Sequence, residues 1–295
     1  MFRYLKLQVQ PAKVIPVAGA FTVEQLSQDA TIPITLHQIN GLPENAKKRI
    51  YRGLLPPHLL AQYEIDPISW NGKEGGQYVR LKAEEDSGKV SLGVTLQPGS
   101  TDEFICIEMG DNAFNGIDLN LLLLNAPDSP TFRTDSDSGG RLTQFGTVRR
   151  NLAEEERAMH AGLAPGQVRR SLGASQIVFQ QMEAFLMILG HRAYFLEPLT
   201  YASAWVFERR GFAYVRGHKL MDDIHREFQP GGILYQALDG STPFRRKEQW
   251  NTVRGRAWAI QDGILEVMGT RWDKLRMVKQ IGRHAGVETF PGSVF

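Results

Sequence analysis

The chain has 295 residues, of which 42% are hydrophobic and 22% are charged; this composition is typical of a folded globular protein and argues against both general disorder and a membrane bundle. Its single cysteine, Cys106, excludes an intramolecular disulfide and a zinc–thiolate cluster, and without a secretory or membrane-spanning pattern we expect a cytoplasmic protein with no membrane partner. The formal net charge of +2 is too small to indicate nucleic acid as a partner.

The first predicted element is a short helix in "PPHLLAQYEI", directly after a pair of prolines, because proline is favoured at the start of a helix. Between residues 77 and 125 the pattern changes to short apolar and β-branched runs, separated by clusters of turn residues. These runs are "QYVRLKA", "KVSLGVTL", "EFICIEM" and "IDLNLLLL". They predict an antiparallel meander of four strands.

Two helices are predicted next. "NLAEEERAMHAG" begins with Asn151 as an N-cap, has Glu154 three residues later and stops at Gly162, which is typical of a capping-box helix. "QIVFQQMEAFLMILG" has one apolar face at helical spacing and ends at Gly190. The residues of this face are Val178, Met182, Phe185 and Leu189.

The remaining pattern alternates between strand and helix. "HRAYFLEPL" predicts a strand, and "TYASAWVFERRGF" predicts a helix with Thr200 as its cap and Gly211 at its end. "AYVRGHKLM" and "ILYQAL" are expected to close the sheet. Further on, four apolar residues are expected to dock the C-terminal part on the core: Trp258, Ile260, Ile264 and Leu265.

The stretch "GLAPGQVRRSLGAS", residues 162–175, places glycines and two arginines immediately before the second helix. Glycine lets another molecule approach the backbone, and the first N–H groups of a helix point outward at its positive end, so the stretch is a candidate anion site. The alternative is an ordinary loop in which glycine and proline make turns and both arginines are solvated.

Two segments resemble the GCN5-related N-acetyltransferases. "APGQVRRSLGAS" is similar to the pyrophosphate loop of that family, with Arg170 at the leading basic position, Gly173 at the glycine and Ser175 at the last small position. "TYASAWVFERRGFAYVRG" is similar to the family's fourth-helix segment, which ends in Gly-Phe. The tyrosine that protonates the departing thiolate in many members falls on Phe207.

The resemblance implies that the chain binds acetyl-CoA or another acyl-CoA as co-substrate and transfers the acyl group to an amine-bearing acceptor. The pyrophosphate would then lie on the loop before the helix. The implied cofactor-binding residues are Arg169, Arg170, Leu172, Gly173, Ala174 and Ser175. A catalytically silent acyl-CoA-binding or assembly protein is the alternative, which Phe207 permits.

Acyl transfer to an amine also needs a base and an acid. Glu108 is a candidate base because it alternates with apolar residues in "EFICIEM", although an exposed strand carboxylate has the same pattern. Tyr201 is a candidate acid, and a packed amphipathic tyrosine is the alternative. His191 and Glu197 are weaker candidates. The histidines of "HKLMDDIHREF", seven residues apart, are expected to lie on different sides of their element and fit no metal motif.

The order of elements predicts a mixed α/β (α+β) fold with a mainly antiparallel central sheet flanked by helices, of the acetyltransferase kind. We expect an N-terminal extension over residues 1–76, an acyl-CoA-binding domain over 77–245, and a C-terminal extension over 246–295 that packs on the core.

Overall fold

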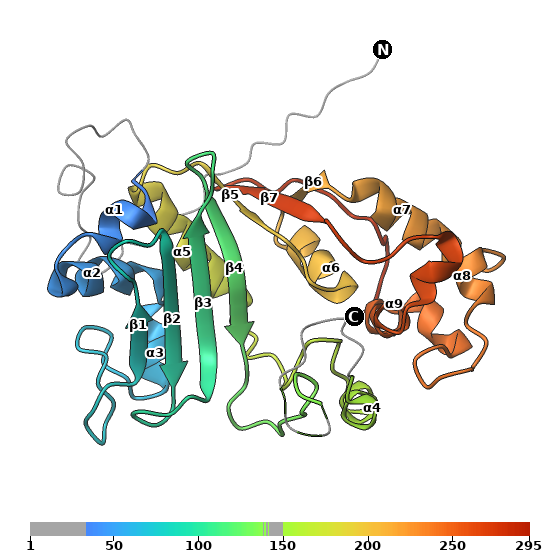
Figure 1. Cartoon of the computed structure of the whole chain (residues 1–295), viewed down its shortest axis with the longest axis horizontal. Coiled ribbons are helices and arrows are strands. Elements are labelled where there is room, and N and C mark those ends of the chain that lie inside the picture. Colours follow the sequence, from blue (N-terminus) through green and yellow to red (C-terminus); the bar gives the residue numbers. More distant parts are fainter. Residues whose placement is uncertain (1–33, 138, 140, 142–149) are drawn as a thin grey trace, which may run out of the picture.

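The computed structural model describes residues 34–137, 139, 141 and 150–295, and these form a mixed α/β fold around a seven-stranded sheet (Figure 1). The strand order is β1-β2-β3-β4-β5-β7-β6. The strands are β1 (Val79–Lys82), β2 (Lys89–Thr95), β3 (Glu103–Asp111), β4 (Ile117–Leu124), β5 (Ala193–Leu196), β6 (Ala213–Arg216) and β7 (Arg276–Gln280). Neighbouring strands are antiparallel except β4 and β5, which are parallel. The predicted mainly antiparallel sheet with flanking helices is therefore confirmed.

The meander β1–β4 forms where the four apolar runs predicted it. On β2, Val90, Leu92 and Val94 are at most 2% exposed, whereas Ser91 between them is half-buried and points to the opposite face. This period of two directs one face of the sheet into the core and leaves the other with polar side chains.

Helices cover the apolar face of the meander and lie behind the strands in Figure 1. They are α1 (Leu36–Asn40), α2 (Glu44–Tyr51), α3 (Pro57–Gln62) and α5 (Ser175–Ile188). The short helix after the proline pair is thus confirmed. The predicted apolar face of α5 is also confirmed, because all four of its residues are fully buried. The Gln181 amide of α5 donates to the Gly53 carbonyl at 2.7 Å, which joins α5 to the N-terminal helices.

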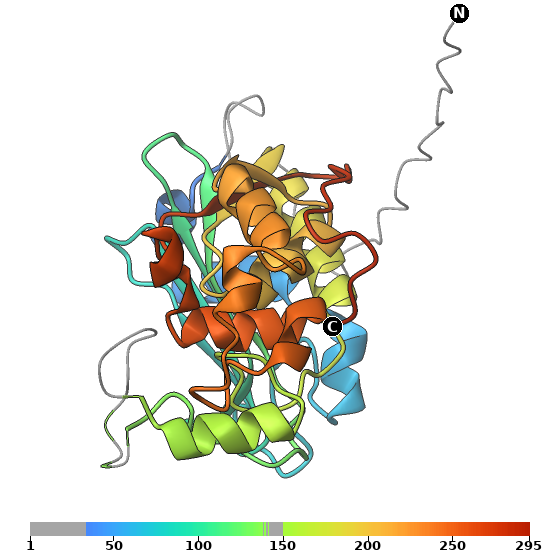
Figure 2. The same cartoon turned by 90° about the vertical axis from the view of Figure 1, so that its right-hand side faces the viewer.

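A second core lies among α6 (Tyr201–Arg209), α7 (His218–Glu227), α8 (Ile233–Gln236) and α9 (Val253–Gln261), which face the viewer in Figure 2. Thr200 caps α6 as expected, and Gly211 after it has φ +84°. The four apolar residues predicted to dock the C-terminal part are at most 7% exposed.

One expectation about the C-terminal half is wrong. "ILYQAL" is not a strand: it forms α8, because Leu234 and Leu238, four residues apart, pack into the second core as one helical face. The sheet is instead completed by β7, which comes from the segment 246–295 and lies between β5 and β6. The division predicted at residue 245 therefore does not coincide with an edge of the sheet.

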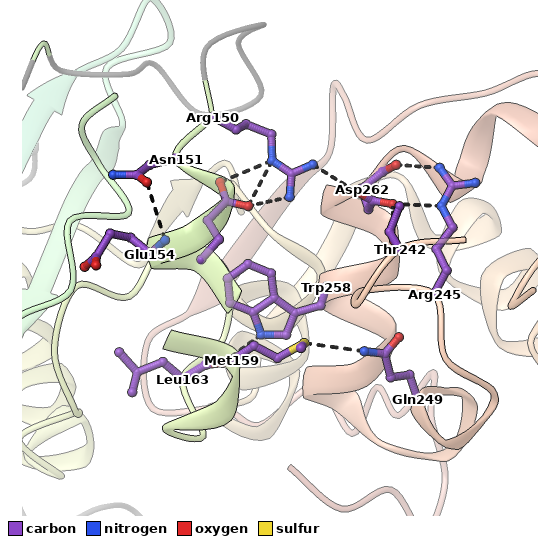
Figure 3. A network of polar contacts seen from close by, with 11 residues as sticks. Arg150, Asn151, Glu154, Met159, Leu163, Thr242, Arg245, Gln249, Trp258 and Asp262 are labelled. Atoms are coloured by element: carbon purple, nitrogen blue, oxygen red, sulfur yellow. Dashed lines mark hydrogen bonds and ion pairs between the residues drawn. The ribbon is translucent and has the colours of Figure 1, made fainter. Parts of the chain in front are cut away.

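Helix α4 (Leu152–His160) is attached to α9 by an ionic network (Figure 3). Arg150 pairs with Glu155 and with Asp262, whose carboxylate also accepts from Arg245 Nε at 2.8 Å. Asn151 caps the helix as predicted by accepting from the Glu154 N–H. The Glu154 carboxylate does not complete a capping box, because it accepts from the Arg133 N–H instead.

Candidate functional site

Strands β4 and β5 are paired over only part of their length. Ile117–Leu119 of β4 pairs with Tyr194–Leu196 of β5, after which β4 continues to Leu124 while β5 has ended. At the same point β4 has a bulge: Met109 of β3 faces Leu119 and Glu108 faces Leu121, so Asn120 has no partner on β3. Bulges interrupt pairing and redirect the strand, and here the bulge stands where the two parallel strands separate.

Beyond the bulge, one backbone edge of β4 faces away from β3. The Leu124 carbonyl accepts from the Leu172 N–H at 2.9 Å, so the backbone polar groups of Leu124 point toward the loop before α5. Because successive residues of a strand direct these groups to alternate sides, the groups of Leu122 point the same way. In the described part of the chain no strand pairs with this edge between Leu119 and Leu124.

The glycine-arginine loop is tied to the end of β4 and leads directly into α5. The Ala126 N–H donates to the Arg170 carbonyl at 2.8 Å, and Asn125 and Ser171 form an antiparallel bridge. Gly173 has φ +74°, and a Cβ built on it would meet no atom within 4 Å. Glycine therefore suits both the left-handed backbone and the open space above it.

The N-terminus of α5 has backbone donors with no partner among the described residues. The Leu172 N–H is engaged by Leu124 and the Gly173 N–H donates to the Ser171 hydroxyl at 3.2 Å. The described chain supplies no acceptor for the N–H groups of residues 174–177. These four donors lie at the positive end of a 14-residue helix, an arrangement that favours an anion.

The six predicted cofactor-binding residues thus fall into two groups. Leu172 fixes the loop to β4, because its N–H donates to the Leu124 carbonyl. Arg169 also fixes the loop: its guanidinium donates to Thr131 Oγ1 and to the Asp102 carboxylate, each at 2.7 Å. Arg170 is exposed and its side chain has no partner in the described chain. The Arg170 side chain and the N–H groups of Ala174 and Ser175 therefore remain available to a ligand in the described chain, and Gly173, whose N–H is used by Ser171, leaves open space above its backbone.

A residue that the sequence did not single out also lies at the start of α5. Arg210, which follows α6, donates from Nη2 to the Ser175 hydroxyl at 2.8 Å. The doublet Arg209–Arg210 was visible in the sequence, but nothing in it distinguishes the arginine that reaches α5 from its neighbour.

Glu108 lies on the face of the sheet opposite the helices. Its neighbours Ile107 and Met109 are fully buried in the core, whereas the Glu108 carboxylate is half-buried and accepts from the Ser91 hydroxyl at 3.3 Å. On the neighbouring strand β4, Glu108 is paired with Leu121, which is next to the bulge at Asn120. The structure therefore places Glu108 beside the point where β4 and β5 separate.

Tyr201 lies in the second core. It is 1% exposed, its hydroxyl accepts from Arg256 Nη1 at 3.5 Å, and burial raises the pKa of the phenol to about 12. Phe207 lies in a different cluster, packed on Phe179 of α5 and on Phe212 with ring centroids 6.2 and 5.3 Å apart. The two side chains of α6 therefore face different directions, as six residues of helix require.

The weaker candidates are separated. His191 is 5% exposed, its Nε2 lies 3.0 Å from the Ile34 carbonyl, and burial lowers its pKa. Glu197 follows β5 and pairs with Arg276 at 3.3 Å. Each has a structural explanation, and the structure does not bring them together.

The prediction that the two histidines of α7 lie on different sides is wrong. Seven residues are nearly two full turns, so His218 and His225 share one side of the helix but stand about 10 Å apart along it. Within the described ranges, no group of three or more His, Cys, Asp or Glu side chains is arranged to hold a metal ion.

No protein-family model, curated protein or solved structure matches this chain. None of the helices in the described ranges is both long and apolar enough to cross a bilayer.

Proposed function

We propose that this protein is an acyl-CoA-dependent N-acyltransferase of the GCN5-related kind, which moves an acetyl or other acyl group from coenzyme A to an amine. The observation that carries the proposal is the edge of β4 that no described strand pairs with. This edge leads from the bulge at Asn120 to the N–H groups at the start of α5 that have no acceptor among the described residues. A strand edge pairs with an extended molecule that has amide groups, and a helix N-terminus receives phosphate. Coenzyme A combines both features in one molecule.

The dimensions support the same ligand. From Leu124 to Asn120 the edge of β4 spans four residues, or about 13 Å at the rise of an antiparallel strand. The arm of coenzyme A between its phosphates and its sulfur has about 13 covalent bonds and reaches roughly 15 Å, at the length per bond of an extended peptide. Phosphates held at α5 would thus bring the thioester close to the bulge, where a backbone N–H can polarise its carbonyl.

The proposed reaction uses Glu108 as the base. The acceptor ammonium gives a proton to the Glu108 carboxylate, directly or through water, and the neutral amine attacks the thioester carbonyl. The tetrahedral intermediate then loses its second nitrogen proton to solvent and collapses, so that the C–S bond breaks, the thiolate leaves and the nitrogen becomes an amide. Phe207 has no proton to give, so the thiolate takes one from solvent; with a thiol pKa near 8.5 it is an acceptable leaving group at neutral pH.

One observation favours a second candidate, a protein that binds acyl-CoA without turning it over. Phe207 occupies the position at which the resemblance places the acid, and it is packed against two other rings. A binding or assembly protein needs the phosphate site and the strand edge but no acid.

Calorimetry with acetyl-CoA tests both candidates, since both require binding and its absence removes both. Release of free thiol with a panel of amines then separates them. Turnover above the rate without protein supports the transferase, whereas binding without thiol release supports the silent protein.

A further inference from the structure

Arg210 is a cation at the start of α5 that pairs with no carboxylate among the described residues. Most arginines at comparable depth in this fold pair with a carboxylate, as Arg150 does with Glu155 and Arg245 with Asp262. In the described part of the chain the only partner of the Arg210 guanidinium is the Ser175 hydroxyl.

The side chain of Arg210 is only partly satisfied. Its Nε is buried and has no hydrogen-bond partner among the described residues. A buried donor without an acceptor is costly, and the cost is greater for a charged group. The Ser175 hydroxyl that it holds is on the first residue of α5, beside the four unpartnered backbone N–H groups. A cation, a hydroxyl and backbone donors therefore converge, and no carboxylate of the described residues pairs with them.

The neighbouring arginine has the opposite character. Arg209 pairs with Glu288 at 3.3 Å, and its guanidinium lies over the Trp205 ring at 5.0 Å. The two arginines are adjacent in sequence and have the same charge, but within the described ranges Arg209 has a carboxylate partner and Arg210 has none.

We propose that Arg210 binds a phosphate of the acyl donor and thereby selects phosphorylated thioesters over thioesters of bare pantetheine. This inference rests on the proposed function, because it takes the donor to lie on α5 and β4. The guanidinium donates charge-assisted hydrogen bonds to the phosphate oxygens, and its bond to Ser175 Oγ leaves the hydroxyl proton to point at the same group.

The test measures the dissociation constants of coenzyme A, phosphopantetheine and pantetheine by calorimetry for the native protein, Arg210→Gln and the matched control Arg209→Gln. Because hydrogen bonds to charged groups contribute about 1.5–3 kcal/mol, Arg210→Gln is expected to weaken coenzyme A binding by about ten- to a hundredfold. Pantetheine binding should stay unchanged, and Arg209→Gln should change coenzyme A binding by less than about threefold. If phosphopantetheine loses as much as coenzyme A, Arg210 contacts the phosphate that both share; if only coenzyme A loses, it contacts a more distant phosphate.

An equal loss for pantetheine and coenzyme A would overturn the proposal, and so would a loss in Arg210→Gln no greater than in Arg209→Gln. Should the glutamine variant not fold, Arg210→Lys decides: it keeps the charge but not the planar donors, so it should lose part of the coenzyme A affinity and no pantetheine affinity. If the native protein binds pantetheine, phosphopantetheine and coenzyme A with equal affinity, the inference about Arg210 fails while the strand-edge site stands. If it binds none of the three, the proposed function fails as well.

Discussion

The loop before α5 offers a sharp test at Gly173. The substitution Gly173→Asp adds a side chain above the unpartnered N–H groups, where a phosphate is proposed to lie. The backbone has φ +74° and a new Cβ would touch nothing within 4 Å. The folded state therefore loses only the cost of a left-handed backbone, about 1–2 kcal/mol, which aspartate tolerates better than most residues.

The effect on binding is larger and comes from charge. Two unit charges about 6 Å apart repel by roughly 0.7 kcal/mol in water and by about 3 kcal/mol at an effective dielectric constant of 20. The diphosphate of coenzyme A has about two negative charges, and Gly173 is exposed to solvent, so an intermediate loss of about 2–4 kcal/mol is expected. Gly173→Asp should thus weaken coenzyme A binding by roughly thirty- to several-hundredfold.

Gly269→Asp is the matched control. Gly269 also has positive φ, +66°, and open space at its Cβ, but it follows the 3₁₀ turn Ile264–Met268. Both variants should lose similar stability in urea denaturation, and calorimetry should show a loss of coenzyme A affinity in Gly173→Asp alone. Equal affinities in the two variants would refute the phosphate site on α5.

Four further outcomes are expected. If Glu108 is the base, Glu108→Gln lowers turnover at pH 7 by at least about a hundredfold and leaves coenzyme A binding intact; normal turnover would exclude this role. Tyr201→Phe, at a buried hydroxyl bonded to Arg256, lowers turnover by less than about tenfold, and a hundredfold loss with normal binding would make Tyr201 the acid. Arg150→Met removes the cation of two ion pairs whose side chains are at most 18% exposed and costs about 3 kcal/mol in urea denaturation. Arg157→Met removes a side chain of α4 that is 65% exposed and pairs with Glu154, and it costs under about 0.5 kcal/mol. Because burial lowers the pKa of His191 in the folded protein, the unfolded chain binds this proton at a higher pH than the folded chain does. The free energy of unfolding is therefore expected to fall as the pH drops below about 6.5. The same fall in His191→Gln would contradict this.

Local patterns predicted much of the fold. The caps at Asn151 and Thr200, the positive φ of Gly211 and the buried face of α5 all depend on residues that are close together in the sequence. The strands of the meander were predicted for the same reason, since alternation and turn residues are local. The completion of the sheet was not predicted. β7 pairs with β5, which lies more than about 80 residues earlier in the chain, and "RMVKQ" is too short and too polar to be recognised as a strand from its sequence.

The bulge at Asn120 and the early end of β5 could not be predicted from the sequence for a related reason. In "IDLNLLLL" one polar residue interrupts an apolar run, which is compatible with a regular strand whose Asn120 faces solvent. Whether a residue is paired or bulged depends on the register of the neighbouring strand, and here β3 sets it through the pairs at Met109 and Glu108.

The two arginines of the glycine-arginine loop show most directly what the sequence leaves open. Arg169 and Arg170 are adjacent and equally charged, and a motif alone assigns both to a phosphate. The fold assigns Arg169 to Asp102, a partner 67 residues away, and leaves Arg170 exposed. Arg210 is brought to the same helix end from a segment that follows α6. An anion site consists of the donors that the fold has not used, and the donors that remain unused are known only once every long-range partner has been placed. The motif therefore predicts where an anion site lies, while the tertiary contacts decide which of its residues have donors left for a ligand.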